Sequence, residues 1–208
     1  MIEQSNPQPL SVLALVCSLK SGNSPSSSEI LAQQVLAELR THNTTGTIIR
    51  VVDHNILPGV ETDMGKGDDW PEIRSQILGA DILLIATPIW VGHPSSIAQR
   101  IIERLDAELG ETDDQGRLLT YGKVGVVAVV GNEDGAHKVC ADMFQALNDV
   151  GFTIPAIGST YWVGEAMNKV DYKDLDKTPD NVAETTKSLA ANAAHLARLL
   201  KDSQYPAV

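Results

Sequence analysis

The chain is poor in the features that mark several large classes of protein. It has two cysteines, Cys17 and Cys140, which cannot build a disulfide framework and show no C-x-x-C spacing for zinc or redox chemistry. No apolar stretch approaches membrane-spanning length, and residues 1–9 are polar, without the basic region and apolar core of a signal peptide. We therefore expect a cytoplasmic protein in which residues 1–9 form a flexible tail.

Positive charge is also scarce. Sixteen Lys and Arg residues against 27 Asp and Glu residues give a net charge of −11 at pH 7. Nucleic acids and anionic membranes attract basic surfaces, so we expect neither as a partner. The five histidines show no metal-ligand spacing, and we expect no metal site. With 43% apolar and 21% charged residues, the composition is that of an ordinary globular protein, and residues 1–208 fit one domain.

Short apolar runs alternate with amphipathic stretches along the chain. Strands are predicted at residues 10–17, 47–53, 80–87, 124–130 and 152–157. Helices are predicted at residues 30–39, 70–78, 95–109, 134–150 and 181–200. Near-continuous apolar strands separated by helices are typical of a parallel α/β sheet covered by helices on both faces. Five such units predict a doubly wound sheet of strand order 2-1-3-4-5, with ligands at the carboxyl ends of the strands.

The loop after the first predicted strand is rich in serine. It contains Ser18, Lys20, Ser26, Ser27 and Ser28 and leads directly into the first helix. Hydroxyls and backbone N–H groups at a helix N-terminus suit a phosphate, and the helix dipole adds to the attraction. The alternative is a flexible loop in which Ser27 or Ser28 is an ordinary N-cap. The position of the loop after strand one favours phosphate binding.

The loop after the third predicted strand carries Pro88, Ile89, Trp90, Val91 and Gly92. Proline fixes the direction in which the chain leaves the strand, and glycine permits close approach of a ligand. Trp90 is suited to lie against a planar ring, although most tryptophans pack on neighbouring elements instead.

The loop after the fourth predicted strand contains Gly131, Asn132, Glu133, Asp134 and Gly135. It is too polar and too rich in glycine for a simple connection, and its backbone N–H groups are suited to the edge of a ring. It also starts the next helix, with Asp134 as the expected N-cap. A phosphate loop together with two loops suited to a flat ring predicts a site for flavin mononucleotide (FMN).

Several further residues allow two interpretations. His93 and His137 fall in the ligand loops and either contact the ligand or are solvated. Tyr161 and Trp162 follow the fifth predicted strand, and either line the substrate side of the site or pack under the last helix. The acidic stretch at residues 171–176 is expected to be a solvated connection.

At these loops the chain resembles the flavodoxin-like NAD(P)H-dependent oxidoreductases, in particular the FMN reductase and iron–sulfur-flavoprotein-like group. Ser18-Leu19-Lys20 is similar to the Ser-x-Arg phosphate loop of that group. Thr87, Pro88, Trp90 and Gly92 match its (T/S)-P-x-(Y/W)-x-G segment, and Glu103-Arg104 is similar to an acid–Arg pair that ends its third helix. Two departures are Cys17, where the group usually has glycine, and Lys20, where arginine is common.

The resemblance implies a flavodoxin-like fold, FMN as cofactor and NADPH or NADH as reductant. It also implies a quinone, free flavin or similar small electron acceptor, and a homodimer or homotetramer. Hydride passes directly to the flavin, so no catalytic side chain is expected. The connection at residues 54–69 contains no cysteine, and thiolates are what hold iron–sulfur clusters, so we expect no cluster. A flavodoxin-type electron carrier without NAD(P)H activity and an FMN-free binding or regulatory domain remain alternatives.

Overall fold

The computed structural model describes residues 8–166 and 168–207, so residues 1–7 of the expected tail lie outside the described residues. The strands are β1 (Leu10–Val16), β2 (Thr44–Arg50), β3 (Ile82–Trp90), β4 (His93–Pro94), β5 (Val124–Gly131) and β6 (Ser159–Val163). The α-helices are α1 (Ser27–Arg40), α2 (Trp70–Gly79), α3 (Ser96–Leu105), α4 (Ala136–Asp149) and α5 (Asp180–Asp202). Short 3₁₀ helices lie at η1 (Val51–Asp53), η2 (Asp106–Gly110) and η3 (Tyr172–Asp174).

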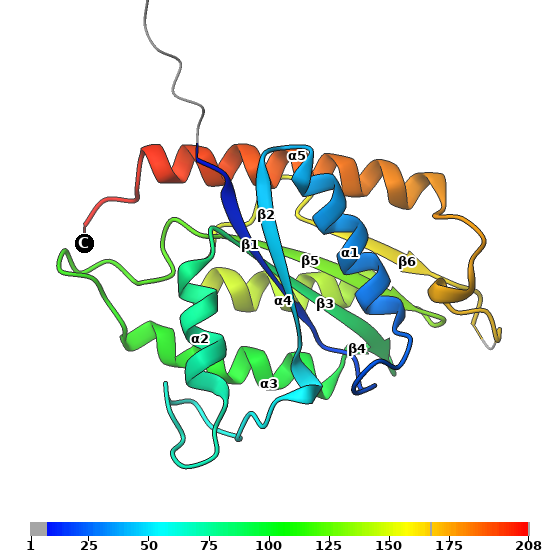
Figure 1. Ribbon diagram of the computed structural model, residues 1–208, viewed down its shortest axis with the longest axis horizontal. Coiled ribbons are helices and arrows are strands. Elements are labelled where there is room, and N and C mark those ends of the chain that lie inside the picture. Colours follow the sequence, from blue (N-terminus) through cyan, green and yellow to red (C-terminus); the bar gives the residue numbers. More distant parts are fainter. Residues whose placement is uncertain (1–7, 167, 208) are drawn as a thin grey trace, which may run out of the picture.

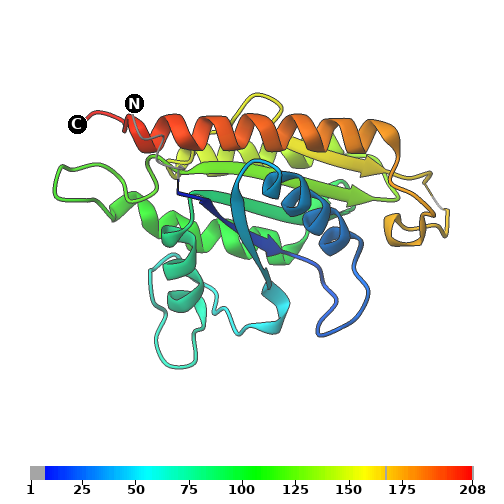
Figure 2. The ribbon, with the colours of Figure 1, turned by 45° about the horizontal axis from the view of Figure 1, so that its top comes forward.

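The sheet has the strand order β2-β1-β3-β5-β6, with β4 paired only to β3 (Figure 1). All neighbouring pairs along this path are parallel, whereas the β3–β4 pair is antiparallel. Counted without the short β4, this is the predicted order 2-1-3-4-5, which is the flavodoxin-like arrangement. Helices α1 and α5 cover one face of the sheet, and α2, α3 and α4 cover the other (Figure 1, Figure 2).

The central strands are buried on both faces, which explains their unbroken apolar sequence. In β1, Leu13 and Leu15 belong to the core under α2, α3 and α4, whereas Val12 and Ala14 belong to the core under α1 and α5. Successive side chains of a strand point to opposite faces, so a strand covered twice needs an apolar residue at every position.

The fifth predicted strand is wrong in position, because β6 lies at residues 159–163 rather than 152–157. Within 152–157 only Thr153 makes a bridge to the sheet, with Val124. Pro155 has no backbone N–H to donate, and Ile157 has a φ of 55°, which is not an extended conformation. Phe152 is buried in the core without joining the ladder. Tyr161 and Trp162 therefore lie within a strand, not after one.

The loop predicted after the third strand is mostly a β-hairpin. Strand β3 continues through Trp90, which pairs with His93, and Ile89 pairs with Pro94. The turn residues Val91 and Gly92 have φ values of 53° and 72°. Two consecutive positive φ angles are the mark of a type I′ turn, whose twist matches that of the two strands. The hairpin therefore projects from the carboxyl end of the sheet.

Candidate functional site

A cavity of about 570 Å³ opens at the carboxyl ends of the parallel strands. This volume lies within the roughly 300–1,000 Å³ of small-molecule sites. Its walls come from the loop after β1, the end of β3, the loop after β5 and the segment that follows β6. The lining residues are Ser18, Leu19, Lys20, Ser26, Ser27, Ser28, Pro88, Ile89, Trp90, Val130, Gly131, Asn132, Glu133, Trp162, Ala166, Asn168, Asp171 and Tyr172.

The three loops predicted to form one site thus lie around one cavity. Four of the predicted residues are not among the lining residues: Val91, Gly92, Asp134 and Gly135. Val91 projects into solvent with 85% of its surface exposed. Gly135 lies against the hairpin so closely that a Cβ atom on it would come within 2.9 Å of the Gly92 Cα atom. Gly135 therefore packs against the hairpin and does not line the cavity.

One end of the cavity is suited to an anion. Ser26, rather than Ser27 or Ser28, is the N-cap of α1, and its hydroxyl accepts a hydrogen bond from the Glu29 N–H at 3.4 Å. The first N–H groups of a helix have no partner within the helix and carry its positive dipole end. Lys20 is exposed beside them, and its backbone N–H donates to the buried Ser18 hydroxyl at 3.1 Å. Serine hydroxyls, the first turn of α1 and the Lys20 side chain therefore line the same cavity.

Two tryptophans also line the cavity. Trp90 is 52% exposed and lines the cavity. Trp162 lies on the α1/α5 face of β6, with its ring centroid 5.5 Å from that of Tyr172. Its neighbour Tyr161 packs on the opposite face, where its hydroxyl lies 2.7 Å from Nε2 of His137. Of the two aromatic candidates in β6, Trp162 is therefore the one that lines the cavity.

The cavity lining also has a polar part, which includes Asn132 and Asp171. The Asn132 amide Nδ2 donates to the Asp171 carboxylate at 2.8 Å, whereas the Asn132 Oδ1 atom is buried without a hydrogen-bond partner among the described residues. Asp171 and Tyr172 belong to the stretch that was expected to be a solvated connection. That expectation is wrong here, because Tyr172 is buried and its hydroxyl donates to Gln34 on α1. Burial raises the pKa of Tyr172 above its ordinary value.

His93 and His137, the two histidines of the ligand loops, are not among the residues that line the cavity. Nδ1 of His93 lies 3.1 Å from Nζ of Lys138, and Lys138 also forms an ion pair with Asp142. His137 contacts Tyr161 instead.

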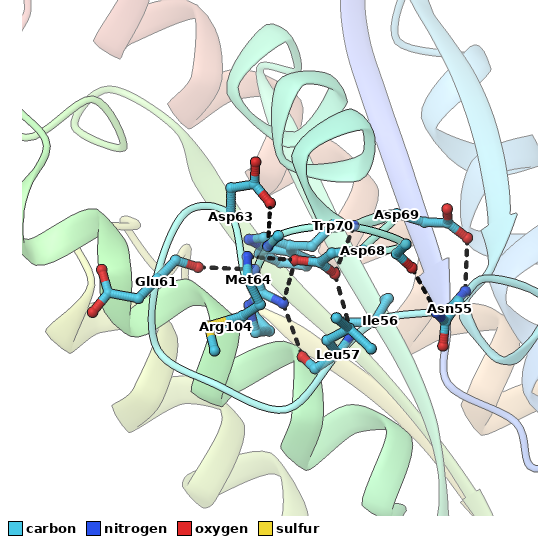
Figure 3. Close-up of polar contacts among 12 residues, drawn as sticks. Asn55, Ile56, Leu57, Glu61, Asp63, Met64, Asp68, Asp69, Trp70 and Arg104 are labelled. Atoms are coloured by element: carbon cyan, nitrogen blue, oxygen red, sulfur yellow. Dashed lines mark hydrogen bonds and ion pairs between the residues drawn. The ribbon is translucent and has the colours of Figure 1, made fainter.

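The connection between β2 and α2 lies beside the site and is organised around a buried ion pair (Figure 3). The Arg104 guanidinium donates to the carbonyl oxygens of Leu57 and Glu61 and forms an ion pair with Asp68 at 2.8 Å. Both charged side chains have no exposed surface. Burial pushes the pKa of Asp68 upward, but hydrogen bonds from Arg104 and three backbone N–H groups, including that of Met64, outweigh it and hold this pKa below its ordinary value. The acid–Arg motif thus pairs Arg104 with Asp68 rather than with its neighbour in sequence.

The described residues hold no group of three or more His, Cys, Asp or Glu side chains placed to bind a metal. Within the same residues no helix combines the length and apolar character needed to cross a membrane. Cys17 and Cys140 are buried, and burial raises the pKa of both thiols. Both cysteines are therefore packed in the protein interior in the thiol form.

Comparison with known proteins adds three relatives. The 8-demethyl-8-aminoriboflavin-5'-phosphate synthase of Streptomyces davaonensis is 30% identical over 208 residues, which cover 94% of this chain and 80% of that protein. The crystal structure of RosB with bound 8-demethyl-8-formylriboflavin-5'-phosphate has a TM-score of 0.85 at 29% identity, over 94% of this chain and 82% of that one. The divalent metal cation transporter MntH of Mycobacterium bovis is 32% identical over 199 residues, which cover 92% of this chain but 29% of the transporter.

The chain therefore spans less than a third of the transporter's length and most of the synthase's length. A sequence family matches residues 10–168, the part of the chain that contains β1 to β6 and most of the cavity. By this match the chain belongs to the NADPH-dependent FMN reductase family.

Proposed function

We propose that the cavity binds FMN and that the protein is an oxidoreductase that takes hydride from NADPH or NADH and passes electrons to a small acceptor such as a quinone or free flavin. The observation that carries this proposal is that serine hydroxyls, the N-terminus of α1 and Lys20 line the same cavity as two tryptophans. The family match and the flavin-linked relatives support it.

The residues present fit FMN. The N-terminus of α1, Lys20 and the buried serine hydroxyls would hold the phosphate. Trp90 and Trp162 would contact the ring. Asn132, whose buried Oδ1 atom has no hydrogen-bond partner within the described residues, would stand in the polar part of the lining beside it. FMN, when bound, supplies the hydride and electron chemistry, and the protein supplies anchoring, orientation and tuning.

The chain's own residues would act mainly by position. Pro88 and Ile89 continue β3 to the cavity and carry the hairpin, and the Gly92 N–H donates to the Glu133 carboxylate at 3.4 Å. This contact links the two ring loops, so the ring would meet a preformed wall. A site on rigid strands and a tight turn loses little conformational entropy when it binds.

A second candidate function is supported by the relatives. The Streptomyces davaonensis relative is named as a synthase of 8-demethyl-8-aminoriboflavin-5'-phosphate, a phosphorylated flavin, and the match covers 94% of this chain. In this alternative the phosphorylated flavin occupies the same cavity but is a substrate that leaves with an altered ring substituent. The two candidates differ in whether the flavin is recovered unchanged.

One experiment separates these candidates. The purified protein is mixed with FMN, its visible spectrum is recorded, and NADPH or NADH is added without oxygen. Bleaching of the flavin band, with recovery of FMN of unchanged mass after air is admitted, supports the reductase. A parallel incubation in air with FMN and an amino donor such as glutamate tests the flavin-modifying enzyme, because replacing a ring methyl by an amino group needs both an oxidant and a source of nitrogen. Flavin of altered mass in that incubation supports this enzyme. Bound flavin that NADPH and NADH leave oxidised and unmodified supports the electron carrier, and absence of FMN binding contradicts all three.

A further inference from the structure

Arg50, the last residue of β2, lies behind the phosphate loop rather than in the cavity lining. Its side chain is only 9% exposed. The Nη1 atom donates to the carbonyl oxygens of Gly22 and Ser24, the latter at 2.9 Å, and reaches that of Lys20 at 3.5 Å. One guanidinium group thus gathers carbonyl oxygens from three residues of a single loop.

The second terminal nitrogen of Arg50 has a different partner. Nη2 forms an ion pair with the carboxylate of Glu29, which lies in the first turn of α1. That turn begins at the serines where a phosphate would bind. An uncompensated carboxylate at this position would repel a phosphate dianion across a short distance.

These contacts have one electrostatic consequence. The negative ends of three carbonyl dipoles and the charge of Glu29 are all turned toward Arg50. The groups that line the cavity beside the N-terminus of α1 are the serine hydroxyls, Lys20 and Asp171, and the Asp171 carboxylate is itself paired with Lys173. Arg50 removes negative potential from the loop, whereas Lys20 is placed to contact the anion itself.

We infer that Arg50 is a positioning residue that makes the cavity selective for the phosphorylated flavin over riboflavin, by holding the loop at residues 20–24 and neutralising Glu29. This inference rests on the proposed FMN binding. Arg50 does not line the cavity, so its effect on selectivity would be indirect. Its replacement should change the affinity for the phosphate of FMN without changing the affinity for the ring.

The test measures the dissociation constants of FMN and riboflavin by flavin fluorescence for the wild type, Arg50→Gln and Arg50→Lys. For Arg50→Gln we expect FMN affinity to fall by about tenfold and riboflavin affinity to stay within about twofold. Arg50→Lys keeps the positive charge beside Glu29 but loses the planar guanidinium group. Its FMN affinity should therefore lie between that of the wild type and that of Arg50→Gln. Arg50→Lys also provides the test if Arg50→Gln does not fold. Arg40→Gln, an exposed change in the last turn of α1, is the control for the change in net charge.

One double variant distinguishes repulsion by Glu29 from a change in loop geometry. Adding Glu29→Gln to Arg50→Gln should restore part of the FMN affinity, because the unpaired carboxylate is removed. Equal losses for FMN and riboflavin, or unchanged affinity for both in the Arg50 variants, would overturn the inference while leaving FMN binding intact. If the wild type binds neither flavin, the proposed function itself fails.

Discussion

Replacing Asp68 by asparagine removes one charge from a buried pair and leaves its partner, Arg104, without compensation. Both side chains have no exposed surface, and the carboxylate lies 2.8 Å from the guanidinium. It also accepts hydrogen bonds from the backbone N–H groups of Leu57 and Met64 at 3.1 and 3.0 Å. Asparagine preserves the shape, so the loss reports the charge and its hydrogen bonds.

The magnitude follows from the burial. Breaking a buried ion pair by removing one partner costs about 3–5 kcal/mol, against a total stability of about 5–15 kcal/mol for a domain. We expect Asp68→Asn to lower the free energy of unfolding by this amount in urea at pH 7, followed by circular dichroism. The matched control is Asp63→Asn, an exposed change in the same loop, which should stay within about 0.5 kcal/mol.

The same pair predicts a pH dependence. The folded-state pKa of Asp68 lies below its ordinary value, so its contribution is present above the unfolded-state pKa, which is about 4, and is lost as the pH falls through the folded value. The stability difference between the wild type and Asp68→Asn should therefore shrink in acid. A loss below about 1 kcal/mol at pH 7, or a difference that does not change with pH, would refute the reasoning.

Four further outcomes are expected. Val91→Asn should raise the free energy of unfolding by about 1 kcal/mol, because asparagine tolerates a φ of 53° better than a β-branched residue; a lower melting temperature would contradict this. Gly135→Ala should cost about 2 kcal/mol or more in urea, since its φ is 118° and the new Cβ would meet the hairpin backbone; a neutral result would show that the hairpin yields easily. Lys20→Ala should weaken FMN binding more than riboflavin binding in fluorescence titrations, and equal effects would show that Lys20 does not contact the phosphate. Trp162→Leu should weaken both flavins alike while Tyr161→Phe leaves them unchanged, and the reverse pattern would place the ring on the other face of β6.

Much of the fold could be predicted because the central strands are buried on both sides. Runs such as residues 82–86 and 124–130 contain no polar residue, and their alternation with helices predicts a parallel sheet, for which 2-1-3-4-5 is one of the common doubly wound orders. The fifth strand was misplaced because residues 152–157 are also apolar. Apolar character records burial, whereas ladder pairing also requires extended backbone and free N–H groups, which Pro155 and Ile157 do not supply.

The loops of the site could be predicted because each follows a strand of a parallel sheet. The carboxyl ends of such strands lie at the same edge, so the loops after them meet there. The wall built by Asp171 and Tyr172 could not be predicted, because an acidic stretch is usually solvated and its contact with Gln34 joins residues far apart in sequence. The contacts of Arg50 could not be predicted either, because the carbonyl group of Ser24 belongs to a loop far from Arg50 in sequence. The cytoplasmic location and the homodimer or homotetramer remain predictions.

A crystal structure of the protein grown with FMN tests the central claim most directly. The account predicts phosphate oxygens within hydrogen-bond distance of the first N–H groups of α1, with Lys20 beside them and the ring in contact with Trp162. A flavin bound elsewhere, for example on the opposite face of β6 beside His137 and Tyr161, would contradict it.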